Sequence, residues 1–194
     1  MSSKNSPGKQ KIILISVVAI VLIAIGVFIY MQVLVPNQKY DEGMNALKQG
    51  NYDEAIATFQ ALGTHKDAAL QAKEAQYQKA MYLVSEKEFD QAKAIFEMNG
   101  DYKDATMQVK ETQYQKGLDL IVNAEFDQAK AVFADLGDYR DAITQIDEAE
   151  YQRGKWLVTQ GNYAEATEVF TSLVDYSDAA RQISEVQYQK AVSI

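Results

Sequence analysis

The sequence predicts an all-α protein, in which one N-terminal transmembrane helix is followed by an α-solenoid of about four helical hairpins, each 37 residues long. Two observations predict this fold. An uncharged apolar run covers residues 12–35, and a set of residue types then recurs at a constant spacing through residues 36–194. The predicted organisation is a short basic N-terminus (1–11), a transmembrane helix (12–35) and a helical repeat domain (36–194).

The apolar run from Ile12 to Val35 contains 24 residues and no charge. As a helix it would span about 36 Å, and the hydrocarbon core of a bilayer is about 30 Å thick. A cleaved signal peptide would have a shorter apolar region, about 7–15 residues, that ends in a small-x-small cleavage site. This run instead ends in bulky residues between Tyr30 and Pro36. The sequence therefore favours an uncleaved anchor.

The flanking charges predict the orientation of this anchor. Three lysines and no acidic residue precede the run, whereas Lys39 on the far side is followed at once by Asp41 and Glu42. Because cytoplasmic flanks are enriched in lysine and arginine, we expect a single-pass protein of the cell membrane with a cytoplasmic N-terminus and extracytoplasmic repeats. The chain has no cysteine, and this absence fits either side of the membrane.

The repeat is visible in residue types that recur every 37 positions. The series comprise a tyrosine (Tyr40, Tyr77, Tyr114, Tyr151, Tyr188), an alanine (Ala55, Ala92, Ala129, Ala166), a phenylalanine (Phe59, Phe96, Phe133, Phe170) and another aromatic residue (Tyr52, Phe89, Phe126, Tyr163). We call the helix that carries the recurring tyrosine helix A, and the helix that carries the recurring phenylalanine helix B. In helix B the aromatic residue, the alanine and the phenylalanine fall at i, i+3 and i+7, so they share one face.

Glycines and short polar residues between the helices predict where helix B ends and the next helix A begins. Gly63, Gly100 and Gly137 follow helix B and suit the end of a helix, whereas Val174 breaks the pattern in the last unit. Each glycine is followed by a short oxygen-bearing residue, with an aspartate three positions later, as in Asp101 and Asp104. Such residues cap a helix N-terminus, so we expect helix A to start there and to run for about twenty residues, for example from Tyr102 to about Val122.

Small residues on helix A (Gly43, Ala80, Gly117, Gly154) complete the pattern, and the stretch from Lys48 to Ala55 reads Lys-Gln-Gly-Asn-Tyr-Asp-Glu-Ala. With the alanine and phenylalanine series, these residues resemble the tetratricopeptide repeat family over about residues 38–194. The resemblance implies stacked two-helix units and a protein-binding role. The chain departs from the family in its longer period and in lacking the closing proline. Its Gly-Asp-Tyr-Lys-Asp-Ala connector resembles that of single-pass repeat proteins from Gram-positive bacteria, which implies a bacterial cell envelope.

The repeat register makes a prediction about the membrane junction. The first helix A would have to begin 37 residues before Thr64, at Val27, which lies inside the apolar run. We therefore expect the membrane helix to continue, kinked at Pro36, into a shortened helix A around Tyr40, with no flexible tether.

Several function classes find no support in the sequence. The chain has a single histidine, His65, which replaces the connector tyrosine and which we expect to be a surface substitution. No phosphate-binding loop, nucleophile elbow or calcium-loop spacing occurs, and paired carboxylates recur in every unit as capping groups would. We predict no enzyme activity, no cofactor and no metal site. The acidic composition, with a pI near 4.7, argues against nucleic acid as a partner.

Two ladders on helix A are candidate partner-binding residues. If the stacked A helices line a concave groove, a partner could contact a tyrosine ladder (Tyr77, Tyr114, Tyr151) and a glutamate ladder (Glu74, Glu111, Glu148). The alternative is structural: the tyrosines pack between neighbouring helices while the charged residues solvate the edges. Tyr82 and Trp156 occupy a position that does not repeat, so they are further candidates for specific contacts.

These observations favour a membrane-anchored scaffold that binds another protein at the cell envelope. An architectural subunit of a larger or homo-oligomeric membrane complex is an alternative, and a large exposed apolar patch would favour it. A third possibility is an envelope protein that binds a glycan or small molecule, which would need an enclosed pocket.

Overall fold

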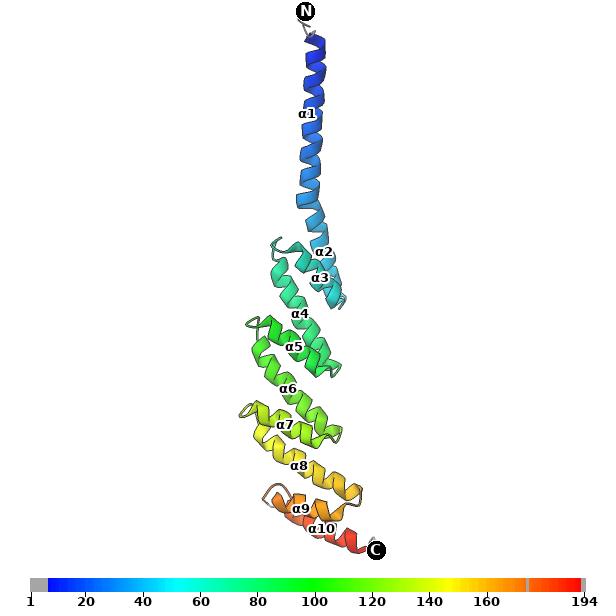
Figure 1. Ribbon diagram of the computed structural model, residues 1–194, viewed down its shortest axis with the longest axis vertical. Helices are drawn as coiled ribbons and strands as arrows, with labels where there is room; N and C mark the ends of the chain where they lie inside the picture. Colours follow the sequence, from blue (N-terminus) through cyan, green and yellow to red (C-terminus); the bar gives the residue numbers. More distant parts are fainter. Residues whose placement is uncertain (1–6, 174, 193–194) are drawn as a thin grey trace, which may run out of the picture. The chain divides into compact units, whose positions relative to one another are not determined.

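A computed structural model describes residues 7–173 and 175–192, which form helices joined by short turns, with no β-strand among them. The helices follow one another as consecutive antiparallel hairpins (Figure 1). Their bounds are α1 Pro7–Ile29, the π-helix η1 Tyr30–Leu34, α2 Val35–Lys48, α3 Tyr52–Leu62, α4 Ala68–Ser85, α5 Phe89–Asn99, α6 Ala105–Val122, α7 Phe126–Leu136, α8 Ala142–Thr159, α9 Tyr163–Ser172 and α10 Ala179–Val192. The predicted all-α, solenoid-like fold is confirmed.

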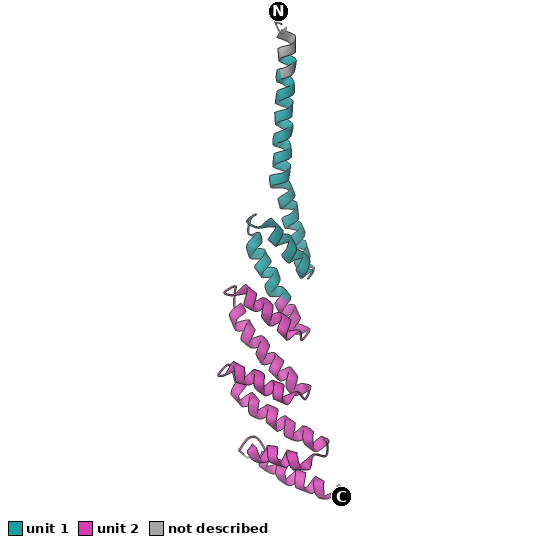
Figure 2. Ribbon diagram, viewed as in Figure 1, with its two compact units in different colours: residues 1–79 teal, residues 80–194 magenta. Residues whose placement is uncertain are grey.

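The chain forms two compact units, residues 1–79 and residues 80–194, which we call unit 1 and unit 2 (Figure 2). Unit 1 holds the N-terminal helix and the first hairpin, and the division between the units falls within α4. In unit 2 each helix packs on the next one along the chain, from α5 to α10.

In unit 1 the apolar N-terminal helix continues into the first hairpin without a non-helical break, as the register predicts. The backbone is irregular just before Pro36, where η1 has π-helical geometry and the Val35 N–H donates to the Tyr30 carbonyl five residues earlier. Because proline has no N–H and its ring crowds the preceding turn, a widened turn is the local solution. The first helix A is not shortened: residues 31–48 are all helical and stand in register with α4.

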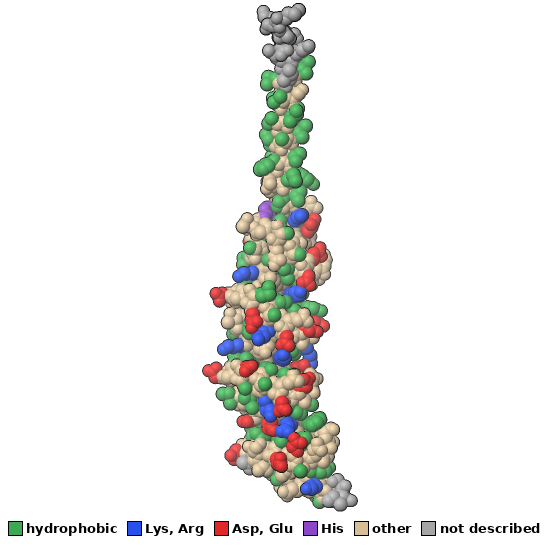
Figure 3. Space-filling view, in the orientation of Figure 1, with side chains coloured by type: hydrophobic (Ala, Val, Ile, Leu, Met, Phe, Trp, Pro, Cys, Tyr) green, Lys and Arg blue, Asp and Glu red, His purple; other side chains and the backbone are tan. Residues whose placement is uncertain are grey.

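Within the described residues one helix, Leu14–Lys48, is long and apolar enough to cross a membrane. Its apolar window has no buried residue, and Figure 3 shows mainly apolar side chains along the coloured part of the N-terminal helix. Charged side chains of both signs cover the hairpins in the same view. Exposed apolar side chains all around a helix are unfavourable in water and suit a lipid environment.

The core of each hairpin is a phenylalanine on helix B. Phe59, Phe133 and Phe170 have no exposed surface. A glycine on helix A lets each ring approach closely, since a Cβ atom added at Gly117 would lie 2.5 Å from Phe133 Cζ. The recurring tyrosine packs edge-on against the same ring, for example Tyr114 with a centroid distance of 5.6 Å from Phe133. These contacts explain why the small residue, the tyrosine and the phenylalanine recur together.

Helix B ends where the sequence predicts, whereas the next helix A begins later than predicted. The glycines after helix B do adopt positive φ, such as Gly137 at 60°. Helix A, however, begins after the second aspartate: α6 starts at Ala105 with Asp104 as its N-terminal flanking residue, and that side chain does not cap the helix. The predicted start at Tyr102 was therefore three residues too early. The break in the pattern at Val174 lies outside the described residues.

Candidate interaction surface

The tyrosine ladder lies inside the repeat array. Tyr114 and Tyr151 are buried, and their hydroxyls donate to Asp141 (2.5 Å) and Asp178. Tyr40 donates to Asp67 in the same way, at 2.5 Å. Each bond joins helix A to the connector that follows its own hairpin, 27 residues away in the chain. Tyr77, at the same register, is half-buried.

These hydrogen bonds shift the acidity of both partners. Burial and the bond to Asp141 raise the pKa of Tyr114 to about 12. The Tyr151 hydroxyl, together with Arg181, lowers the pKa of Asp178 to about 2. A carboxylate that accepts hydrogen bonds in its charged form is harder to protonate, so each connector is bound most firmly when its aspartate is ionised.

The variant Tyr151→Phe is expected to be less stable than the unmodified protein at neutral pH. This difference in the free energy of unfolding should disappear in acid. Because the pKa of Asp178 is lowered on folding, its contribution is present above about pH 4 and disappears as the pH falls toward about 2. Urea unfolding of both proteins across this pH range measures the effect. Tyr188→Phe is the control, since Tyr188 has the same register but is exposed. A difference that persists unchanged in acid would contradict the prediction.

The glutamate ladder also contacts the connectors. Glu111 accepts from the Tyr139 hydroxyl at 2.8 Å and pairs with Arg140 at 3.0 Å. Glu148 accepts from Tyr176 at 2.8 Å, and burial together with this carboxylate raises the Tyr176 pKa to about 12. Glu74, at the same register, is half-buried. A direct role of either ladder in partner binding stays a prediction.

In the first hairpin a histidine–asparagine pair replaces the tyrosine–glutamate pair. His65 stands where the other connectors have tyrosine, and Asn37 stands where the other A helices have glutamate. The His65 Nε2 atom lies 3.2 Å from Asn37 Oδ1, and His65 is half-buried. His65 is therefore not a simple surface substitution, because it occupies the structural position of the connector tyrosine.

Three of the exposed large apolar side chains of unit 2, Leu118, Val122 and Trp156, line shallow grooves where the start of a helix B meets the second half of the next helix A. We call these depressions the aromatic grooves, because each is bordered by the aromatic residue that begins a helix B. One lies beside Phe126 and Trp156, whose ring centroids are 6.3 Å apart, and Arg153 completes its lining. Trp156 keeps 43% of its surface exposed. The register-equivalent groove of the last hairpin lies beside Tyr163 and Lys190.

The aromatic groove at Phe89 is lined by more apolar side chains than the groove at Trp156. Val84, Leu118 and Val122 line it, and Lys87 pairs with Asp119 at its edge. Val122 is 79% exposed. The sequence carried a signal for this residue, since Val122 is apolar where the same register holds Lys48, Ser85 and Thr159. Tyr82, at the register of Trp156, is 50% exposed.

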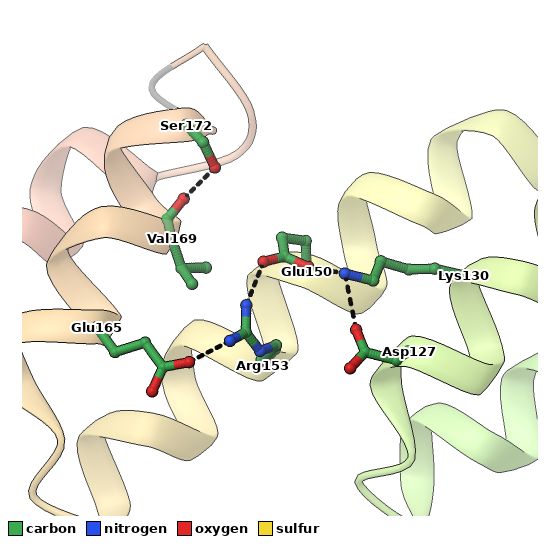
Figure 4. Close-up of polar contacts among 7 residues, drawn as sticks. All are labelled: Asp127, Lys130, Glu150, Arg153, Glu165, Val169 and Ser172. Atoms are coloured by element: carbon green, nitrogen blue, oxygen red, sulfur yellow. Dashed lines mark hydrogen bonds and ion pairs between the residues drawn. The ribbon is translucent and has the colours of Figure 1, made fainter.

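Figure 4 shows an ion-pair network, two members of which, Asp127 and Arg153, also line the groove at Trp156. Lys130 of α7 binds Asp127 at 3.1 Å and Glu150 of α8 at 2.5 Å. Arg153 bridges Glu150, at 2.7 Å, to Glu165 of α9. Burial disfavours the charge on Lys130, but its bonds to Glu150 and Asp127 outweigh this and raise its pKa. The network fixes Arg153 at the wall of the groove.

The described residues contain no group of three or more histidine, cysteine, aspartate or glutamate side chains that could hold a metal ion. The grooves are open to solvent and lack the enclosed form of a small-molecule site. What the surface offers is exposed apolar and aromatic area with charges at its edge, which is the usual composition of a protein-binding surface.

Comparison with known families agrees with this geometry. The family model of the tetratricopeptide repeat matches residues 40–65, which cover most of α2, α3 and the start of the first connector. No match was found among curated proteins.

Proposed function

We propose that this chain, a tetratricopeptide-like helical repeat protein, is a single-pass membrane scaffold that binds another protein of the cell envelope through the aromatic grooves of unit 2. The observation that carries the proposal is Trp156, a large aromatic side chain that stays 43% exposed beside Phe126. Nothing in the stacking of the hairpins demands a tryptophan there, since the same register holds asparagine, tyrosine and aspartate elsewhere. Exposed tryptophans beside apolar walls are typical binding hot spots.

The groove also indicates the chemistry of its partner. Its floor is aromatic, and its acidic edge includes Asp127, whose side chain is 86% exposed. The chain as a whole is acidic, with a formal net charge of −8. A partner segment with an apolar anchor flanked by lysine or arginine would complement both features. Proteins of the tetratricopeptide type generally act as non-catalytic scaffolds, and we propose no catalytic role here.

The membrane location rests on α1 and its flanks. The helix has the length and composition of a membrane span. Lys4, Lys9 and Lys11 precede this span, which supports a cytoplasmic N-terminus and extracytoplasmic hairpins.

The test is crosslinking in intact cells, with a photoreactive amino acid placed at Leu118 in the neighbouring groove. We expect one dominant envelope protein in the adduct, and about tenfold less adduct when Trp156→Ala is added, because a hot-spot truncation removes about 1–2 kcal/mol or more of binding energy. Met98→Ala is the matched control, since Met98 is 73% exposed and lies outside the grooves. Protease added outside the cell must also cleave the hairpins.

Other outcomes point to the remaining function classes. Adducts only with further copies of this chain would favour an architectural, homo-oligomeric subunit. Equal adduct yields for Trp156→Ala and Met98→Ala would refute the groove as the binding surface. Protection of the hairpins from external protease would reverse the proposed topology.

A further inference from the structure

The first connector, residues 63–67, packs back against the helix that emerges from the apolar run. His65 Nε2 lies 3.2 Å from Asn37 Oδ1, and the Lys66 ammonium lies 4.4 Å from the centre of the Tyr40 ring. The Tyr40 hydroxyl binds Asp67 at 2.5 Å. Three consecutive connector residues are thus fixed to α2, all within unit 1.

The position of these contacts along the helix sets their depth. Asn37 follows Val35, the last residue of the apolar run, by two positions, which is about 3 Å of helix rise. The headgroup layers add about 5–8 Å of thickness on each side of the hydrocarbon core. The helix is continuous from α1 through η1 to α2, so no flexible segment separates the connector from the span.

We infer that this connector lies in the lipid-headgroup layer, so that the first hairpin rests on the bilayer surface. This inference depends on the membrane anchor included in the proposed function. The partner of this surface is the phospholipid headgroup layer, and the contact is set by the anchoring helix.

The chemistry of the connector supports this placement. In the other repeats the residue at the position of His65 is a tyrosine, and the residue at the position of Asn37 is a glutamate (Glu74, Glu111, Glu148). Hydrogen bonds join Tyr139 to Glu111 and Tyr176 to Glu148. Only the copy next to the apolar run has Asn37 in place of the carboxylate. The Asn37–His65 pair makes this contact without the negative charge that Glu111 and Glu148 carry at the same register, so the contact adds no further carboxylate beside the hydrocarbon boundary. The exposed side chains of Lys39 and Lys66 are suited to phosphate oxygens.

The absence of cysteine allows a direct depth measurement with single labels. An environment-sensitive fluorophore is attached to Thr64→Cys in the connector, to Gln49→Cys, and to Ile23→Cys within the apolar run. All three native side chains are exposed. Gln49 lies at the opposite end of α2, 12 residues after Asn37 and therefore about 18 Å farther along the helix. Each full-length protein is reconstituted into vesicles of phosphatidylcholine and phosphatidylglycerol in equal amounts, which carry a nitroxide quencher on the headgroup or in the middle of the acyl chain.

We expect the headgroup quencher to remove most of the fluorescence at Thr64→Cys and little at Gln49→Cys, whereas the acyl-chain quencher acts on Ile23→Cys. Equal and weak quenching at Thr64→Cys and Gln49→Cys, with Ile23→Cys still quenched, would overturn the inference and leave the anchor intact. Absence of acyl-chain quenching at Ile23→Cys would refute the anchor itself, and the inference with it.

Discussion

The substitution Phe133→Ala is expected to destabilise unit 2 by about 3–5 kcal/mol, the usual effect of removing a buried aromatic ring. Phe133 has no exposed surface and packs on the Tyr114 ring and on the backbone of Gly117. Gly117 itself has no side chain that could move into the vacated space, so we expect a cavity to remain. Since the free energy of unfolding of a whole domain is only about 5–15 kcal/mol, this single substitution removes a large part of the stability.

Trp156, the only tryptophan, lies in unit 2, so its fluorescence reports urea unfolding of this part of the full-length protein. Far-UV circular dichroism gives a second probe of the same transition. Met98→Ala is the control, because Met98 is 73% exposed and should change stability by only a few tenths of a kcal/mol. A loss at Phe133→Ala as small as that of Met98→Ala would mean that the hairpin core is not where the structure places it.

The periodic residues predicted the fold because each of them solves the same packing problem in every unit. The 37-residue series of tyrosine, small residue, alanine and phenylalanine placed both helices of the hairpin and the face that each one buries. Their partners were harder to predict. The recurrence of Tyr114 and Glu111 fits a binding groove and an internal contact equally well, and only the distances to Asp141 and Tyr139 show the hydrogen bonds that they make.

Deviations from the repeat held information that the periodicity alone did not reveal. Asn37 departs from the glutamate series and His65 from the connector tyrosine series, both in the first hairpin. The structure shows that these two residues contact each other. Val122 departs singly and is exposed in a groove. The start of helix A was misplaced because an aspartate before a helix predicts a cap, whereas Asp104 and Asp141 accept from the side chains of Gln108 and Gln145 one turn into the helix.

Glu150 is another such deviation, since the same register holds Gln76, Gln113 and Gln187. Its two carboxylate oxygens bind Lys130 on α7 and Arg153 on α8, and Arg153 in turn binds Glu165 on α9 (Figure 4). The side chain of Glu150 is only 18% exposed, and those of the two cations are 28% exposed. This carboxylate therefore binds two partly desolvated cations at the contact of three helices.

The variant Glu150→Ala is expected to destabilise unit 2 by about 1–3 kcal/mol, because Lys130 and Arg153 lose their most buried partner and keep only the more exposed carboxylates of Asp127 and Glu165. Glu150→Gln should lose less, since the amide keeps the size of the side chain and can still accept a hydrogen bond. Asp127→Ala is the surface control: that carboxylate is 86% exposed, so its pair with Lys130 should contribute under about 1 kcal/mol. Urea unfolding at low and high salt separates the contributions, because added salt screens exposed pairs more than buried ones. If Glu150→Ala cost no more than Asp127→Ala at either salt concentration, the network would not be what joins these hairpins, and apolar packing between α7, α8 and α9 would have to account for their contact.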